Sequence, residues 1–93
     1  MTNGYNGWTN YETWRVNLEI LDGMMVEDFG YDLHELDVDD YSVVEMLGKA
    51  LEMYTCELVE MDAKGLALDL AHQFLARVDW EEIAEHMIAD ARA

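Results

Sequence analysis

The amino-acid sequence predicts an all-α fold, a compact irregular four-helix bundle with an acidic loop between its first and second long helices. Two observations predict it. Apolar residues recur at helical spacing in four segments, and no segment shows the sustained alternation of a β-strand. The 93 residues contain no proline, and their 52% of apolar residues is enough for one modest core. We therefore expect a single domain over residues 1–93.

The first helix is predicted to begin at Thr9. Glu12 follows three residues later, which is the spacing of a capping box, and Gly23 is the predicted end. Residues 1–8, rich in asparagine and glycine, precede the helix as an irregular leader. The predicted apolar face of the helix consists of Tyr11, Trp14, Leu18 and Leu21. Trp8 is expected to pack back onto the first turn as a hydrophobic staple; the alternative is an exposed aromatic patch for a partner.

A short helical piece and a loop are predicted next. Residues 24–29 form the helical piece, which Gly30 ends. Residues 31–41 form the loop, because most of their side chains are polar. The loop residues expected to find buried contacts are Leu33, Leu36 and Val38.

The longest helix follows the loop. Asp39, Asp40 or Ser42 can cap it, and Ser42 with Glu45 has the capping-box spacing. Its predicted buried face consists of Val43, Leu47, Ala50, Leu51, Tyr54 and Leu58, widened by Met46 and Met53. Gly48 costs this helix about 1 kcal/mol relative to alanine, so we expect it to mark a close helix crossing.

Two shorter helices complete the predicted bundle. Asp79 is expected to end the third helix and cap the fourth, with Glu82 at the capping-box position. The third helix has an apolar face of Leu66, Leu70, Ala71, Phe74, Leu75 and Val78. The fourth has an inner face of Trp80, Ile83, Ala84, Met87 and Ala91.

The charge of the chain is its most unusual feature. Twenty-one acidic residues face five basic ones, for a formal net charge of −16. Over the expected surface this is about one net negative charge per 350 Å², whereas duplex DNA carries about one per 100 Å². Only a face on which acids cluster therefore approaches the charge density of DNA. Direct binding of nucleic acid is not expected, because it requires a basic face.

The strongest candidate site is an acidic tract between positions 27 and 40, which contains no lysine or arginine. Its acids are Glu27, Asp28, Asp32, Glu35, Asp37, Asp39 and Asp40. Ordered on a helix end and a loop, these carboxylates would imitate spaced phosphates and occupy the basic groove of a DNA-binding protein. The alternative is a solvated acidic loop.

Apolar side chains next to this tract are candidate anchors for a protein partner. They are Met24, Met25, Phe29 and Tyr31. Methionine adapts to irregular surfaces, and aromatic side chains are frequent at binding hot spots. The alternative is that these side chains fill the core.

No catalytic or metal-binding motif is found in the sequence. There is no Gly-rich phosphate loop, no Gly-x-Ser-x-Gly and no His-Glu-x-x-His. A calcium-binding loop needs glycine at position six and glutamate at position twelve. Counted from Asp37, these positions are Ser42 and Gly48, so the pattern does not match. Cys56 has acidic neighbours, which raise the pKa of a thiol and disfavour a nucleophile. We expect neither an enzyme nor a bound metal or cofactor.

The composition predicts a cytoplasmic protein. The N-terminal residues have neither the basic region nor the apolar core of a signal peptide, and no apolar run is long enough to cross a membrane. A single cysteine excludes an internal disulfide.

Two short segments resemble a known group of proteins. The opening Tyr5–Trp14, Tyr-Asn-Gly-Trp-Thr-Asn-Tyr-Glu-Thr-Trp, resembles the start of a family of small acidic proteins found on phages, plasmids and other mobile elements. Residues 78–85, Val-Asp-Trp-Glu-Glu-Ile-Ala-Glu, are similar to the segment that often closes them. The matches cover about a fifth of the chain, and the acidic middle has no counterpart. Arg15 and Glu19 depart from the apolar stretch usual in that family.

The resemblance implies a counter-defence context, because such proteins resemble anti-restriction and anti-CRISPR inhibitors, many of which imitate DNA. We therefore expect an inhibitor in the bacterial cytoplasm that binds a basic nucleic-acid-binding protein of host defence. A CRISPR effector is favoured over a restriction enzyme. The shared ends would supply the scaffold and the middle the specificity. The alternative is a non-enzymatic, self-associating helical scaffold of a phage or plasmid, which forms homodimers.

Overall fold

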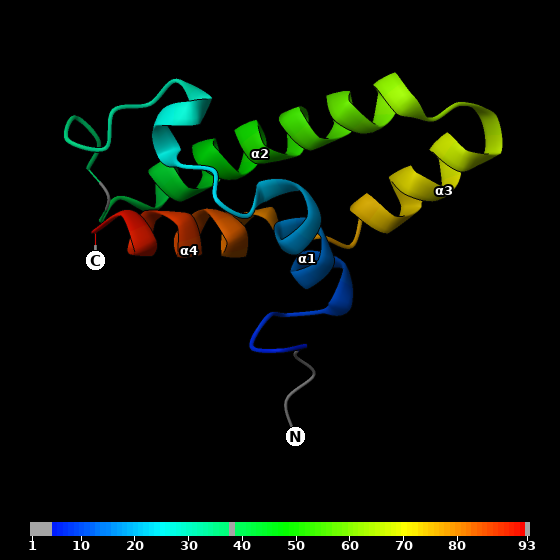
Figure 1. Cartoon of the computed structure of the whole chain (residues 1–93). Coiled ribbons are helices and arrows are strands. Elements are labelled where there is room, and N and C mark those ends of the chain that lie inside the picture. Colours follow the sequence, from blue (N-terminus) through cyan, green and yellow to red (C-terminus); the bar gives the residue numbers. More distant parts are fainter. Residues whose placement is uncertain (1–4, 38, 93) are drawn as a thin grey trace.

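The structure, a computed structural model, describes residues 5–37 and 39–92. Within these residues the predicted all-α, four-helix fold is confirmed (Figure 1). The helices are α1 (Tyr11–Val16), α2 (Tyr41–Asp62), α3 (Gly65–Leu75) and α4 (Trp80–Arg92). A π-helical turn, η1 (Asn17–Leu21), extends α1, and a 3-10 helix, η2 (Val26–Phe29), follows it. Val38 and the first four residues of the predicted leader lie outside the described residues.

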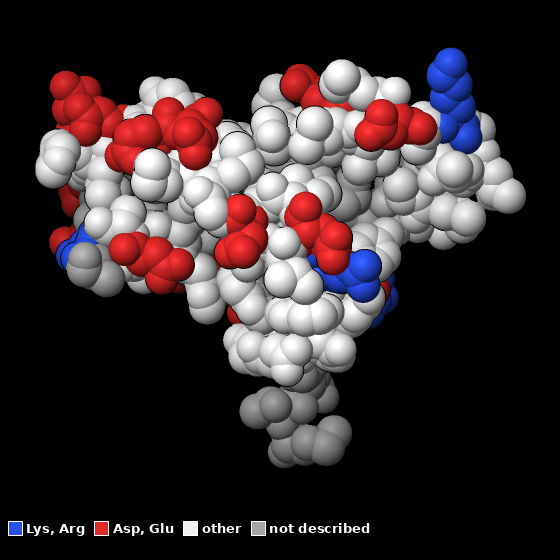
Figure 2. All heavy atoms as spheres, in the orientation of Figure 1, with Lys and Arg blue, Asp and Glu red and all other residues white. Residues whose placement is uncertain are grey.

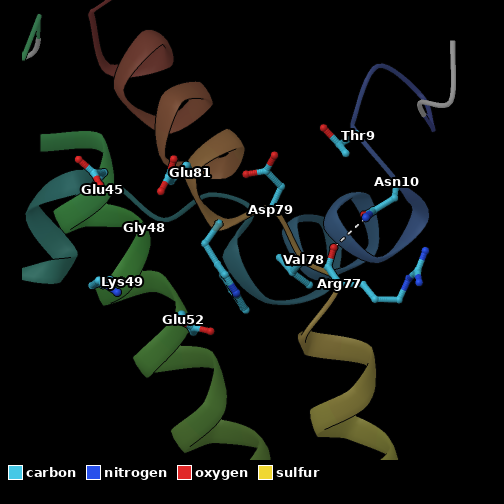
Figure 3. A pocket seen from close by; sticks show the side chains of 11 residues that line it. Thr9, Asn10, Glu45, Gly48, Lys49, Glu52, Arg77, Val78, Asp79 and Glu81 are labelled. Atoms are coloured by element: carbon cyan, nitrogen blue, oxygen red, sulfur yellow. Dashed lines mark hydrogen bonds between the residues drawn. The ribbon is translucent and has the colours of Figure 1, made fainter. Parts of the chain in front are cut away.

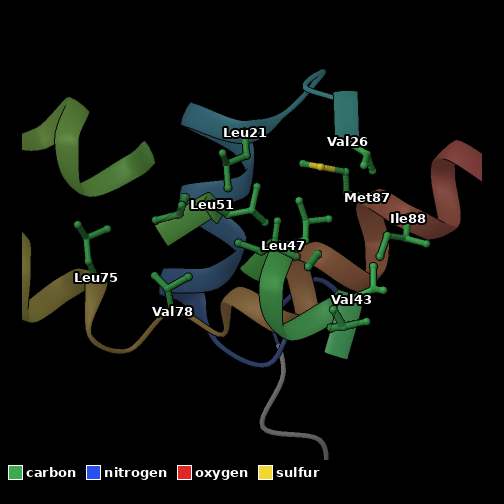
Figure 4. Packing of buried hydrophobic residues seen from close by; sticks show 13 residues of the cluster. Leu21, Val26, Val43, Leu47, Leu51, Leu75, Val78, Met87 and Ile88 are labelled. Atoms are coloured by element: carbon green, nitrogen blue, oxygen red, sulfur yellow. The ribbon is translucent and has the colours of Figure 1, made fainter. Parts of the chain in front are cut away.

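The core lies between α2 and α4, which run side by side (Figure 1). The two helices bury Val43, Val44, Leu47, Leu51, Ile83, Ala84, Met87 and Ile88. Leu21 and Val26, which precede α2 in the chain, also belong to this cluster (Figure 4). The predicted close crossing at Gly48 is confirmed, because a Cβ placed there would lie 3.4 Å from the backbone nitrogen of Glu81.

The helix α1 begins after a different cap from the predicted one. Asn10 is the N-cap, and its side-chain oxygen accepts a 2.8 Å hydrogen bond from the N–H of Thr13. The N–H of Thr9 donates to a carboxylate oxygen of Glu82 in α4, and Glu12 forms an ion pair with the segment between α3 and α4. The predicted Thr9–Glu12 capping box is therefore wrong, because both residues bind distant parts of the chain.

The buried face of α1 and η1 also differs from the predicted one. Thr13, Val16 and Leu21 are buried, whereas Tyr11 and Leu18 are 38% and 47% exposed. A π-helical turn closes its hydrogen bonds over five residues, so Leu21 follows Val16 onto the buried side. The predicted face assumed uninterrupted α-helical spacing, and Leu21 is its one fully buried member.

The end of the predicted irregular leader is a tight turn. Tyr5 and Trp8 exchange two backbone hydrogen bonds, of 2.6 and 2.8 Å. Asn6 and Gly7 have φ angles of 51° and 89°, in the left-handed region that Asn–Gly turns occupy. Trp8 stacks on His86 of α4, with ring centroids 4.1 Å apart, so it docks the turn on α4 and is not a staple on α1.

The predicted loop is confirmed over its described residues except for Tyr41, which begins α2, and the predicted caps at Asp40 and Asp79 are confirmed. Asp40, one of three candidates, caps α2 by accepting a 3.0 Å hydrogen bond from the N–H of Ser42. Asp79 accepts a 3.1 Å hydrogen bond from the N–H of Glu82 at the start of α4. Gly30 ends η2 with a φ of 87°. Each cap is a short-range pattern, which is why the sequence predicts it.

Several side chains predicted to be buried in α2 and α4 are exposed. Met46, Met53, Leu58 and Ala91 are the exposed members of the predicted faces. Thr55, which was not on the predicted face, is fully buried.

The apolar face of α3 differs most from its prediction. Leu75 is buried, but Leu66 is 73% exposed and Leu70 is 55% exposed. Among the described elements, α2 is the main neighbour of α3. The packing of α3 therefore leaves part of its apolar stripe uncovered.

Candidate functional site

The seven acids of the predicted tract are all exposed and lie on η2 and the loop that leads to α2. Acidic side chains gather over this end of the molecule, and others lie over α1 and α2 (Figure 2). The predicted tract is therefore an accessible surface of negative charge.

Four of the seven carboxylates also hold the local backbone in place. The side chains of Asp28, Asp32, Asp37 and Asp40 accept hydrogen bonds from the N–H groups of Met25, His34, Asp39 and Ser42, at 2.8, 2.9, 3.2 and 3.0 Å. Such bonds order the tract into successive turns. The backbone N–H of Ser42, and then its hydroxyl, hold the pKa of Asp40 below its usual value, so Asp40 stays charged at neutral pH.

The other three acids of the tract are Glu27, Glu35 and Asp39, and all are exposed. Asp39 lies 3.7 Å from Arg92 at the end of α4. An exposed ion pair of this length contributes little and leaves the carboxylate available to a partner.

The four predicted anchors do not share one environment. Met24, Phe29 and Tyr31 are half-buried and pack against the core, and Phe29 makes an edge contact with Tyr54, with ring centroids 5.6 Å apart. Met25 is 56% exposed. Core packing therefore accounts for three of them, and Met25 remains the accessible anchor beside the tract.

A second acidic cluster, which the sequence analysis missed, lies where α2 meets α4. The hydroxyl of Tyr41 donates a hydrogen bond to Glu81. This bond, together with burial and the charges of Glu81, Glu85 and Glu45, raises the pKa of Tyr41 to about 12. We call Tyr41, Glu45, Glu81 and Glu85 the α2–α4 acidic face. Its members lie up to 44 residues apart in sequence, so no local pattern predicts the cluster.

A groove of about 570 Å³ borders this face (Figure 3). Glu45, Lys49 and Glu52 line it from α2, and the segment from Arg77 to Glu81 lines the opposite side. Gly48 also lines the groove, at the crossing of α2 and α4. The groove therefore joins acidic groups from α2 and from the start of α4.

The opening motif of the chain binds the segment between α3 and α4. Thr13 Oγ1 accepts a 2.8 Å hydrogen bond from the N–H of Asp79, and it donates one of 2.7 Å to Asn10. The side-chain amide of Asn10 donates a 2.7 Å hydrogen bond to the carbonyl of Arg77 (Figure 3). We call this set, with the Thr9–Glu82 bond, the terminal clasp. It gives Thr9, Asn10 and Thr13 a structural role in joining the start of the chain to the entry of α4.

In the part of the chain that the structure describes, no three His, Cys, Asp or Glu side chains gather as metal ligands. Cys56 is half-buried, and burial, followed by the charges of Glu52 and Glu60, raises the pKa of its thiol, as predicted. None of the helices in residues 5–37 and 39–92 is both long enough and apolar enough to span a bilayer.

Comparison with known proteins places the chain in a family. Residues 1–92 match DUF7249, a family of unknown function. The chain belongs to the DUF7249 family. This match spans the acidic tract and the α2–α4 acidic face as well as the terminal clasp, whereas the resemblance found in the sequence covered the two ends. No curated protein and no solved structure matches the chain.

Proposed function

We propose that this DUF7249 protein is a non-enzymatic inhibitor, encoded by a phage or plasmid, that acts in the bacterial cytoplasm. It occupies a basic nucleic-acid-binding surface of a host defence complex, with a CRISPR effector as the favoured target and a restriction enzyme as the other. One observation carries the proposal. The acidic tract ends at Asp40, and the next residue, Tyr41, hydrogen-bonds to Glu81 of the α2–α4 acidic face, so one end of the tract meets that face.

This arrangement supports the imitation of nucleic-acid phosphates. The net charge of −16 attracts a basic surface over a long range and accelerates the encounter. Four aspartates of the tract are held by backbone N–H groups, so little order has to be gained when the partner binds. Met25 and Tyr41, both more than half exposed, supply apolar contacts that slow release.

The hydrogen bonds of the tract decide which substitutions can test it. Lysine at Asp37 or Asp40 would remove the side-chain acceptor that holds a turn, and a lost turn would be confused with a lost contact. Asparagine and glutamine keep an acceptor oxygen and remove only the charge. The tract variant is Asp37→Asn/Asp39→Asn/Asp40→Asn, and the face variant is Glu45→Gln/Glu81→Gln/Glu85→Gln. The matched control is Glu57→Gln/Glu60→Gln/Asp62→Asn, which removes the same charge from the other end of α2.

The test measures transformation by a targeted plasmid in cells that carry one defence system at a time. The wild-type protein is expected to restore transformation against at least one CRISPR or restriction system, and the control variant is expected to act like wild type. The tract and face variants should lose the effect while keeping their helical circular dichroism. Relief of no system by the wild-type protein, or full relief by both acidic variants, would show the proposal to be wrong.

Binding of the purified target supplies a second test. Attraction between a −16 chain and a basic surface is screened by salt, so affinity should fall steeply as salt rises. Duplex DNA that the target recognises should compete. Binding that is unchanged by salt and by DNA would contradict the occupation of a nucleic-acid site.

A further inference from the structure

The helix α3 presents apolar side chains to solvent. Leu66 is 73% exposed and Leu70, one turn later, is 55% exposed. Residues four apart lie on the same side of a helix, so the two leucines form one stripe. Single exposed apolar residues are common on protein surfaces. Two strongly exposed leucines on one stripe are more typical of an interaction surface.

An apolar groove lies along this stripe. It has a volume of about 380 Å³ and joins α3 to α1 and η1. Its apolar lining consists of Val16, Ile20, Val59, Leu70, Ala71, Phe74 and Leu75. The charged residues on it, Arg15 and Glu19, neutralise each other across 3.3 Å. The groove is therefore apolar with a neutral rim.

The charge of the α3 region sets it apart from the rest of the chain. Residues 63–78 hold two bases, Lys64 and Arg77, and one acid, Asp69, so their formal net charge is +1. The whole chain carries −16, and the remaining residues therefore carry −17. A basic partner is attracted to the acidic surfaces and has no electrostatic reason to bind α3. A second, equally acidic copy meets the least repulsion at α3.

We propose that the α3 surface, made of Leu66, Leu70 and the adjoining groove, is the interface of a symmetric homodimer. Each copy places the exposed leucines of its α3 against the groove of the other, so that the same patch serves both sides. This contact buries the uncovered apolar stripe. It joins the two chains through a region that is close to neutral, since Glu60 and Glu12 lie against His72 and Arg77 of this region. The inference is independent of the proposed inhibitor function, because it uses neither the acidic tract nor the α2–α4 acidic face.

The test is the mass of the purified full chain in solution, measured by sedimentation equilibrium at low and high salt. We expect a dimer whose dissociation constant falls as salt rises, because salt screens the repulsion between two −16 chains and leaves the apolar contact intact. Leu66→Glu and Leu70→Glu should each weaken the dimer about tenfold or more, since each buries an added charge. Met53→Glu is the matched control, because Met53 is 63% exposed and does not line the groove.

Circular dichroism shows whether each variant remains helical, so that loss of the dimer is distinguished from loss of the fold. A wild-type chain that stays monomeric at both salt concentrations would overturn the proposal, even if the α3 surface then bound an unrelated protein. Equal dissociation constants for Leu66→Glu, Met53→Glu and wild type would also overturn it. The acidic-face variants should still dimerise, so failure of the inhibitor proposal and failure of the dimer are separately visible.

Discussion

The side chain of Thr13 binds the backbone of Asp79, 66 residues later, through a 2.8 Å hydrogen bond to Thr13 Oγ1. Thr13 is fully buried, so this contact replaces water for its hydroxyl. The same oxygen donates to Asn10, and the N–H of Thr13 also bonds to Asn10. One threonine thus binds the N-cap residue of α1, Asn10, and fixes the entry to α4.

Replacement of Thr13 by valine tests this role. Thr13→Val keeps the shape but leaves the Asp79 N–H without its partner, and we expect the free energy of unfolding to fall by about 1–3 kcal/mol. Urea denaturation monitored by circular dichroism measures the change. Thr13→Ser retains the hydroxyl and should lose less stability than the valine variant. A valine variant as stable as wild type would contradict the role of the terminal clasp.

Valine at Thr55 should raise the free energy of unfolding, which is the opposite of its expected effect at Thr13. Thr55 is also fully buried, but its hydroxyl has no hydrogen-bond partner among the described residues. Thr55→Val removes an unsatisfied polar group, and we expect the free energy of unfolding to rise by about 1 kcal/mol. Urea denaturation of the two valine variants side by side is the measurement. Destabilisation by Thr55→Val would mean that the hydroxyl is satisfied in solution.

Gly48 is a site where a small gain in stability is available. A Cβ there would lie 3.4 Å from the backbone of Trp80 and Glu81, which is ordinary contact. Gly48→Ala should therefore raise the free energy of unfolding by about 0.5–1 kcal/mol through helix propensity. Gly48→Leu should lower it, because the larger side chain has to push α4 away. Thermal unfolding of both variants checks the prediction, and a destabilised alanine variant would show that the crossing is tighter than ordinary contact.

Tyr41 gives the fold a dependence on alkaline pH. Its pKa is raised from 10.0 to about 12 in the folded chain, so folding disfavours loss of its proton. The stabilisation that it provides is fully present below pH 10.0 and is lost as the pH rises towards about 12. The stability of the Tyr41→Phe variant should not show this fall between pH 10 and about 12. Urea denaturation of both proteins across this range measures it, and a constant difference between the two curves would mean that Tyr41 titrates alike in folded and unfolded chains.

The two acidic surfaces differ in how far they can be predicted. The tract from Glu27 to Asp40 is continuous in the chain, so its charge is apparent from the sequence. Its hydrogen-bonded turns are also local, since each aspartate binds an N–H two or three residues away. The α2–α4 acidic face joins Tyr41 to Glu81 across 40 residues, and only the packing of α2 on α4 brings these groups together.

The sequence by itself determined the helical class, the loop, the cap at Asp79 and the tract of acids, and it limited the cap of α2 to three residues. Each of these depends on residues within a few positions of one another, where propensity and local hydrogen bonds decide. Tertiary structure alone decided which apolar stripes are covered. The stripe of α3 has the same helical spacing as that of α4, but α4 packs along α2, whereas Leu66 and Leu70 remain exposed. Periodicity shows that a face is apolar, but burial depends on whether another part of the chain reaches it, and this is a long-range property of the fold.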